Sequence, residues 1–339
     1  MPQDALSAPK ASVLIPAYNA APTLGRAIQS ALDQTERDLE IIVIDDGSVD
    51  DTAKIADTYA ARDARVKVVR MPKNGGKSRA LNHAHEIARG RWLAVLDADD
   101  WYHPDRLARV VALGERTSAD MATDNQYLVD AADGAILGAA FGPSSEPRPF
   151  TPSDLIADHT GTNFDRALLK PVLRADFVRR HRLLYPEDAK LGQDYGLLVE
   201  FFAAGGKAWL LPEPLYYYVL PWSPSTGTWT EGGNGAWRYD YRIIRRLNEH
   251  CAERVRGSAD KDLVRAVAWR EQHFVVMEHY MAAVKAFKID RRPDRAAFIL
   301  LSHPRAAMAF MARLARRLGG THQVWGSGKY RAHATDHRA

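Results

Sequence analysis

The sequence predicts an α/β protein with a mostly parallel sheet flanked by helices and a helical extension at its C-terminal end. Three observations lead to this expectation. Apolar β-rich runs alternate with helical patterns over the first hundred residues, polar clusters follow the ends of those runs, and long amphipathic patterns fill the last hundred residues. Strands that alternate with helices indicate right-handed crossover connections and therefore a parallel sheet.

The first hundred residues contain strand patterns at 11–16, 39–46, 66–70 and 92–96. The run at 39–46 is apolar almost throughout, as expected for a strand that is covered on both faces. Helical patterns lie between these strands at 21–34, 47–62 and 77–90. Ser48 and Asp51 have the spacing of a capping box before the second helix. Gly90 stands where a helix is often ended by a left-handed glycine.

The remaining chain divides into three parts by its patterns. From 111 to 225 the periodicity is looser, with a helix expected at 193–204 and strands after the pair Gly205 and Gly206. From 226 to 320 the apolar spacing is helical and is interrupted at Pro304. Residues 1–10 are expected to be flexible and residues 321–339 to form a disordered tail.

Composition and charge limit the class of protein. Of 339 residues only Cys251 is a cysteine, so no intramolecular disulfide is possible and a reducing compartment is expected. The N-terminus lacks the apolar core of a secretory signal, and no run of eighteen apolar residues occurs, so we expect a cytoplasmic protein. Residues 236–339 hold 21 Lys and Arg against 10 Asp and Glu, whereas the rest of the chain is acidic. A basic C-terminal third favours an anionic partner surface.

Polar side chains follow three of the predicted strands at the point where each strand ends. Tyr18 and Asn19 follow the first strand, Asp46 follows the second, and the segment from Asp97 to Asp100 follows the fourth. Ligands of such sheets bind beyond the carboxyl ends of the strands. The three clusters are therefore expected to meet at one edge of the sheet.

Asp97 and Asp99 form an Asp-x-Asp pattern directly after a buried strand. Carboxylates held this close together repel each other, and a shared cation would keep them ionised at neutral pH. A hard divalent ion with oxygen ligands, Mn²⁺ or Mg²⁺, suits such a site. The alternative is a solvated acidic loop in which Asp99 or Asp100 caps the following helix.

Four motifs in this order resemble those of the family 2 glycosyltransferases, a large inverting group with the GT-A fold, and especially the bacterial exopolysaccharide type. They are VLIPAYNA, IIVIDDGSVDDT, NGGKSRALNHA and LDADDWYHPDRL. The resemblance is strong over about residues 11–110, weaker over 111–225, where KLGQDYGLLVEFFAAGG matches, and absent from the last hundred residues. It implies that 11–110 form the nucleotide-sugar-binding half of a GT-A domain and 111–225 the acceptor-binding half.

The resemblance also implies roles for particular residues. Asp46 would accept a hydrogen bond from the N3–H of a uracil-like base, and Asp99 would bind the divalent ion that bridges the diphosphate. The nucleotide would contact Pro16, Tyr18, Asn19, Asp46, Lys77, Arg79, Asp97 and Ala98. For Lys77 and Arg79 the alternative is that both are solvated cations.

A general base must deprotonate the acceptor hydroxyl, and the resemblance implies Asp194. The family has Glu-Asp at this position, whereas here Gln193 precedes Asp194. Asp194 could instead cap the helix at 193–204, and Glu187 and Asp188 are rival bases. Asp158, His159 and Trp222 lie where contacts to the acceptor would be expected.

Arginines are interleaved with apolar residues over 291–318, among them Phe298, Leu301, Met308 and Arg305. An apolar face beside arginines suits peripheral attachment to an anionic membrane, here the inner face of the plasma membrane. The alternative is a helical cap with a solvated cationic face.

Together these features predict an inverting, metal-dependent glycosyltransferase of polysaccharide biosynthesis. It would move a hexose from a nucleotide sugar, expected to be UDP-linked, to a hydroxyl of a glycan or a polyprenyl-linked oligosaccharide. A P-loop is excluded because Met71 stands where that motif requires glycine. The remaining alternative is a non-catalytic nucleotide- or nucleic-acid-binding protein on a similar sheet, although no nucleic-acid-binding motif is present.

Overall fold

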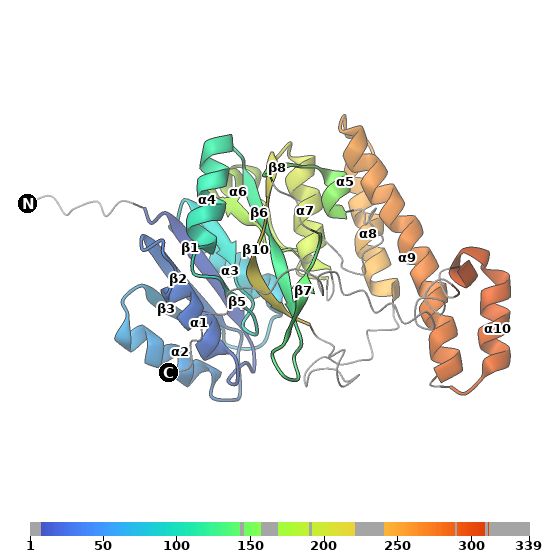
Figure 1. The fold of residues 1–339 in the computed structure, drawn as a ribbon, viewed down its shortest axis with the longest axis horizontal. Helices are drawn as coiled ribbons and strands as arrows, with labels where there is room; N and C mark the ends of the chain where they lie inside the picture. The colour runs from blue at the N-terminus through green and yellow to red at the C-terminus, as the bar shows by residue number, and fades with distance from the viewer. Residues whose placement is uncertain are drawn as a thin grey trace, which may run out of the picture.

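The computed structural model describes residues 8–142, 146–156, 169–189, 192–220, 241–288, 290–308 and 311. Within these residues the chain forms one mixed sheet in the order β3-β2-β1-β4-β9-β6-β10-β5, with β7 paired to β6 and β8 paired to β10 (Figure 1). The strands are β1 (Ala11–Ala17), β2 (Leu39–Asp45), β3 (Val66–Arg70), β4 (Trp92–Val95), β5 (Trp101–Tyr102), β6 (Met121–Val129), β7 (Ile136–Ala139), β8 (Arg148–Phe150), β9 (Val172–Arg174) and β10 (Ala208–Val219).

The predicted mostly parallel sheet is confirmed. Strands β3, β2, β1 and β4 run parallel to one another, and β6 runs parallel to β10. The short strand β9 lies between the two groups and is antiparallel to both β4 and β6. It therefore joins the first half of the sheet to the second.

Helices cover both faces of the sheet because the strand residues alternate between two apolar cores. Leu14, Ile42 and Ile44 face the core formed with α3 and α7, whereas Val13 and Ile15 face the core formed with α1 and α4. The helices are α1 (Leu24–Leu32), α2 (Thr52–Arg62), α3 (Lys77–Ile87), α4 (Arg106–Thr117), α5 (Pro152–Ile156), α6 (Ala175–His181), α7 (Gln193–Ala203), α8 (Tyr241–Val255), α9 (Lys261–Lys288) and α10 (Pro293–Ser302).

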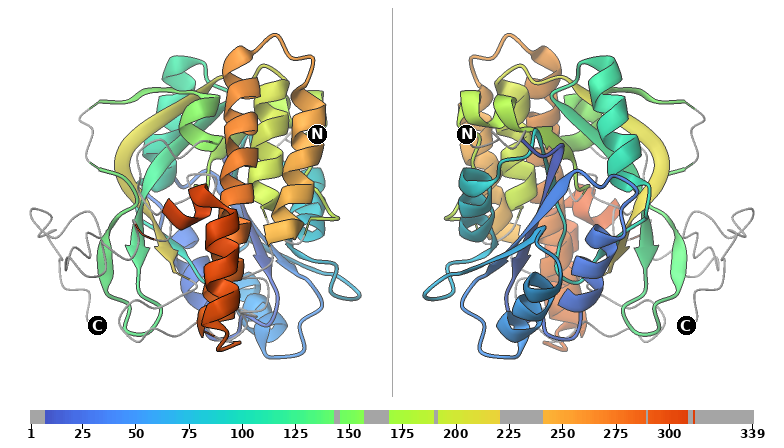
Figure 2. Two further views of the ribbon diagram at one scale, coloured as in Figure 1. Left: turned by 90° about the vertical axis from the view of Figure 1, so that its right-hand side faces the viewer. Right: turned by 90° about the vertical axis from the view of Figure 1, so that its left-hand side faces the viewer.

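The C-terminal helical extension is also confirmed. Helices α8 and α9 share the core on the α7 face through Leu247, Cys251, Val255, Leu263 and Val267. Helix α10 packs against α9 and lies at the end of the molecule away from β1, β2 and β3 (Figures 1 and 2). None of the helices in the described ranges is both long and apolar enough to cross a bilayer.

The structure contradicts the predicted start of α2 and the predicted end of α3. The side chain of Asp51 makes no capping hydrogen bond to α2, and Ser48 Oγ instead accepts a hydrogen bond from the Asn19 backbone N–H at 3.0 Å. Helix α3 ends at Ile87, before Gly90. A Cβ atom at Gly90 would lie 2.4 Å from the Ser12 backbone nitrogen, so glycine is needed there for close approach to β1.

Strand register brings the polar clusters to one edge of the sheet. Ala17 of β1 lies opposite Asp45 of β2, and Leu14 of β1 lies opposite Val95 of β4. Asp97, two residues beyond Val95, therefore comes level with the end of β1. The expectation that the three clusters share an edge follows from this register and is met for the β1, β2 and β4 ends.

Candidate active site

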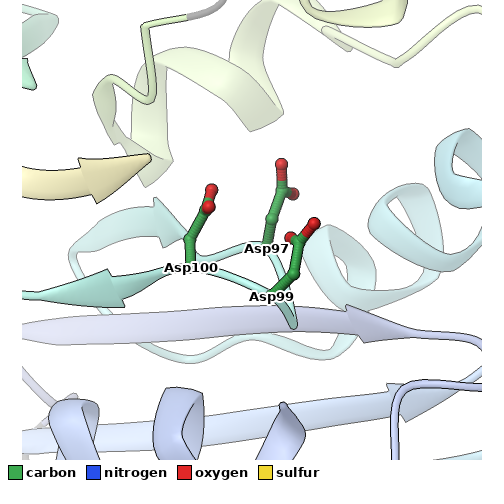
Figure 3. Close-up of side chains that lie close together, drawn as sticks. All are labelled: Asp97, Asp99 and Asp100. Carbon is green, nitrogen blue, oxygen red and sulfur yellow. The ribbon is translucent and has the colours of Figure 1, made fainter. Parts of the chain in front are cut away.

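Three aspartates gather in the turn that joins β4 to β5. One carboxylate oxygen from each of Asp97, Asp99 and Asp100 lies within 4.8 Å of those of the other two. Figure 3 shows the three side chains pointing to the same side of the turn. Their surroundings differ, however, and the differences give each acid its own role.

Asp100 fastens the strand β10 to this turn. Its buried carboxylate accepts hydrogen bonds from the Tyr216 hydroxyl at 2.6 Å and the Val219 backbone N–H at 2.8 Å. Burial, followed by the charges of Asp99 and Asp97, raises the pKa of Asp100 well above its usual value. Helix α4 begins only at Arg106, so the alternative that Asp99 or Asp100 caps this helix is wrong.

Asp97 is held between two lysines. Lys77 Nζ lies 2.6 Å from Asp97 Oδ1, and Lys170 Nζ lies 3.1 Å from Asp97 Oδ2. Burial alone would raise the pKa of Asp97, but the charges of Lys170 and Lys77 and their hydrogen bonds hold it well below its usual range. Asp97 is therefore ionised, and the two lysines compensate its negative charge.

Asp99 differs because its carboxylate is open to solvent and, among the described residues, has no cation within ion-pair distance. Its backbone carbonyl accepts a hydrogen bond from the Arg26 guanidinium at 2.7 Å. Nearby protein atoms remove part of the hydration of the Asp99 carboxyl and so raise its pKa, and the charge of Asp97 raises it further. An accessible carboxylate with uncompensated charge beside two others fits a hard divalent ion that keeps waters and takes phosphate ligands.

Asp194 reaches the same cluster from the first turn of α7. Its Oδ2 accepts a hydrogen bond from Lys170 Nζ at 2.7 Å and lies 3.9 Å from Lys77 Nζ. The N-cap residue of α7 is Gly192, and no side chain caps the helix. The alternative reading of Asp194 as a helix cap is therefore wrong, and its carboxylate is free to act in the cluster.

The neighbouring wall consists of the loops that follow β1, β2 and β3. Both oxygens of the buried Asp46 carboxylate accept backbone hydrogen bonds, from Gly75 at 2.9 Å and Gly76 at 2.7 Å. Asn19 Oδ1 accepts a hydrogen bond from the Val49 N–H at 3.0 Å, and the Tyr18 ring beside it is 49% exposed. This wall therefore presents an exposed aromatic ring.

The other predicted site residues differ in position and in exposure to solvent. Pro16 belongs to the end of β1, Ala98 is buried in the acidic turn, and the exposed Arg79 side chain lies over Gly75. Glu187, a rival base, accepts a hydrogen bond from Asn82 at 3.1 Å and has no contact with Lys170. Asp158, His159 and Trp222 lie outside the described residues.

A cavity of about 750 Å³ lies apart from the aspartate cluster, between α7, α8 and the segment 182–189. Asp188, the second rival base, and Cys251 line it. Burial raises the pKa of the Cys251 thiol to about 12, so this cysteine is not poised as a nucleophile. Cys251 is thus an ordinary buried residue of α8.

The sequence did not reveal Lys170, which joins Asp97 to Asp194, or the group that supports it. Arg106 and Asp124 form a fully buried ion pair at 2.8 Å, and Arg106 also donates a hydrogen bond to the Lys170 carbonyl. The Tyr216 ring lies 5.0 Å from the Arg106 guanidinium. A single lysine before a proline carries no motif, and only the fold shows its partners.

Comparison with known proteins gives a consistent family. The model of glycosyl transferase family 2 matches residues 12–165. The succinoglycan biosynthesis protein ExoO of Rhizobium meliloti (strain 1021) is 34% identical over 220 residues, which cover 62% of this chain and 61% of ExoO. The putative glycosyltransferase EpsE of Bacillus subtilis (strain 168) is 33% identical over 212 residues, covering 62% of this chain and 73% of EpsE. The match thus spans about three fifths of ExoO and most of EpsE.

Solved structures agree on the fold. The mannosyltransferase PcManGT from Pyrobaculum calidifontis, in complex with GDP-Man and Mn²⁺, superposes with a TM-score of 0.59 at 18% identity, covering 91% of this chain and 80% of that one. TarS of S. aureus, residues 1–349 in complex with UDP, gives a TM-score of 0.57 at 18% identity, covering 83% and 73%. At this identity the likeness establishes the fold. With the family model and relatives above, it shows that the chain belongs to glycosyltransferase family 2 and has the GT-A fold.

Proposed function

We propose that this protein is an inverting, metal-dependent glycosyltransferase, and that it transfers a hexose from a nucleotide sugar to a hydroxyl of a glycan. The observation that carries the proposal is the meeting of Asp99, Asp97 and Asp194 around Lys77 and Lys170. Within this cluster Asp99 could bind a metal ion and Asp194 could accept a proton. The lysines provide positive charge for a diphosphate.

Asp194 is proposed as the general base. Its Oδ2 is engaged by Lys170, whereas Oδ1 receives no hydrogen bond from the described part of the chain. Oδ1 would take the proton of the acceptor hydroxyl while the acceptor oxygen attacks the anomeric carbon from the face opposite the nucleotide. A single displacement of this kind inverts the anomeric configuration.

The donor is proposed to lie along the wall formed by the β1, β2 and β3 loops. Asp46 would accept from the N3–H of uracil with lone pairs that Gly75 and Gly76 leave free, and Tyr18 would stack on the base. Lys77, at the start of α3, would move to the diphosphate. Asp99 would hold Mn²⁺ or Mg²⁺, which when bound neutralises charge on the departing nucleoside diphosphate. Asp97 and Ala98 would lie beside the ribose.

Exopolysaccharide biosynthesis is proposed as the setting, because the relatives named succinoglycan biosynthesis proteins share about a third of their aligned residues with this chain. The acceptor would then be a growing glycan, carried on a polyprenyl diphosphate. Residues 11–110 are proposed as the donor-binding half and 111–225 as the acceptor-binding half. Asp158, His159 and Trp222 remain candidate acceptor contacts.

Calorimetry with UDP and GDP, each with and without Mn²⁺, tests the donor site. We expect UDP to bind with a dissociation constant in the micromolar range, and to bind at least about tenfold more weakly without Mn²⁺, because the diphosphate and three carboxylates would then repel each other. Tighter binding of GDP than UDP would contradict the uracil assignment of Asp46. Binding of neither nucleotide would contradict the proposed donor site as a whole.

An anionic membrane surface at the inner face of the plasma membrane is proposed as a further partner, through residues 291–318. In the described part of this segment the apolar side chains of Phe298, Leu301 and Met308 are 70%, 83% and 64% exposed. Phe298 and Leu301 are three residues apart on α10 and so share a face. Arg291, Arg295 and Arg305 beside them are also exposed. A second copy of this chain would bring like charges together, whereas an anionic bilayer would satisfy them.

Sedimentation with phosphatidylglycerol vesicles tests this surface, with phosphatidylcholine vesicles for comparison. Leu301→Glu should weaken binding to the anionic vesicles at least about tenfold. The change removes a leucine that would be buried in the bilayer and adds a negative charge that the anionic lipids repel. Ile136→Glu on β7, an exposed position of similar chemistry (52% exposed), serves as the matched control and should bind like wild type. Equal binding of the wild type to both kinds of vesicle would argue against the charge contribution.

A further inference from the structure

Lys170 is a buried cation with two acidic partners from opposite halves of the site. Its side chain is 3% exposed, and its Nζ lies 2.7 Å from Asp194 Oδ2 and 3.1 Å from Asp97 Oδ2. Asp97 follows β4 in the first half of the chain, whereas Asp194 lies in the first turn of α7 in the second. Burial alone would lower the pKa of Lys170, but the charges of Asp194 and Asp97 raise it well above its usual value.

The backbone at Lys170 is fixed as firmly as its side chain. Its carbonyl accepts a hydrogen bond from Arg106, whose guanidinium is paired with Asp124 of β6 and covered by the rings of Tyr102 and Tyr216. Strand β9 begins two residues later, between β4 and β6. The ammonium group is therefore held on rigid elements, as a group that orients a reacting side chain must be.

We infer that Lys170 is a positioning residue for the transfer reaction: it fixes Asp194 Oδ2 against the donor-side Asp97 and leaves Oδ1 to accept the proton. The inference rests on the proposed function of Asp194 as the base. It goes beyond that proposal because it assigns the two oxygens of Asp194 different tasks and names the group that separates them.

Because the Lys170 ammonium is shared between two carboxylates, it is not left unpaired when one of them becomes protonated. When Asp194 takes up the acceptor proton it becomes neutral, and a lysine paired with Asp194 alone would be left as an unpaired buried charge, which is costly. Asp97, which remains ionised, keeps Lys170 paired throughout. Lys77 is 30% exposed and lies 3.9 Å from Asp194, so it is placed less firmly for this task.

The test measures single-turnover sugar transfer by wild type, Lys170→Met, Lys170→Arg, Asp194→Asn and the double variant Lys170→Met/Asp194→Asn. We expect Lys170→Met to slow transfer about 10²-fold, a part of the 10²- to 10⁴-fold that a general base contributes. UDP affinity should change less than about tenfold, because Lys170 pairs with Asp97 and Asp194 and is not among the residues proposed to contact the nucleotide. Lys170→Arg, which keeps the charge, should recover most of the rate.

The double variant separates positioning from a merely structural role. If Lys170 acts through Asp194, Lys170→Met should cost less than about threefold once Asp194 is asparagine. An unchanged rate in Lys170→Met, or an equal loss in both backgrounds, would overturn the inference.

Two safeguards keep the outcome readable. If Lys170→Met does not fold, the same cycle is measured with Lys170→Gln, which keeps a hydrogen-bond donor in the buried site but removes the charge. A loss that disappears in the Asp194→Asn background supports positioning, and an equal loss contradicts it. Failure of the wild type to bind UDP or transfer sugar, by contrast, would refute the proposed function and not the role of Lys170.

Discussion

Asp99→Asn should abolish the Mn²⁺ dependence of UDP binding and slow sugar transfer by at least about 10³-fold. Of the three clustered acids, only Asp99 is both open to solvent and without a cation in ion-pair distance among the described residues. Asparagine keeps the shape of the side chain and removes its charge. The loss corresponds to about 4 kcal/mol of transition-state stabilisation, within the several kcal/mol that a metal ion supplies.

Calorimetry and initial rates over a range of Mn²⁺ concentrations measure both effects. Asp176→Asn on α6, whose side chain is 80% exposed, is the matched control and should leave both unchanged. Asp100→Asn is a different comparison, because Asp100 accepts hydrogen bonds from Tyr216 and Val219 and its loss should loosen β10. Metal-dependent UDP binding that survives in Asp99→Asn would refute the assignment of the ion to Asp99.

Acidification should weaken metal binding for the same reason. The surrounding protein and Asp97 raise the pKa of Asp99, so its proton is lost at a higher pH than from an ordinary aspartate. Only the ionised carboxylate binds the ion, so proton and metal compete. Mn²⁺-dependent affinity for UDP is therefore expected to fall as the pH drops through this raised pKa.

The sheet could be predicted from the sequence because its signals are local and repeated. Strands β1, β2, β3 and β4 are short runs rich in apolar residues, and helices of the correct spacing lie between them. Gly90 shows the limit of such reasoning. Glycine after a helix serves equally well as a left-handed end or as a place for close approach, and only the contact with Ser12 distinguishes the two.

The candidate site was predictable in part for a similar reason. Asp97, Asp99 and Asp100 are adjacent in the sequence, so their gathering is local, and strand order places Asp46 nearby. The difference between them is not local, because it depends on Lys77, Lys170 and Tyr216, up to 119 residues away. Lys170 has no sequence signal at all, since its partners are set by the position of β9 between β4 and β6.

Asp194→Asn should slow transfer by about 10²- to 10⁴-fold while UDP affinity stays within about threefold of wild type. A general base contributes this much to the rate, and asparagine cannot accept the acceptor proton. Asp194 Oδ2 pairs with Lys170, and Asp194 is not part of the wall around Asp46 that is proposed to bind the uracil. Nucleotide binding should therefore be spared. Single-turnover rates and calorimetry on the same preparation separate the two effects.

The rivals supply the control for this prediction. Glu187→Gln keeps the hydrogen bond to Asn82 and should retain most activity, and Asp188→Asn, in the cavity beside α8, should do the same. A loss in Glu187→Gln as large as that in Asp194→Asn would assign the base to Glu187, seven residues earlier and out of contact with Lys170. Because Lys170 reaches Asp194 and Asp97 but neither rival, the geometry favours Asp194 as the residue whose loss stops transfer without releasing the nucleotide.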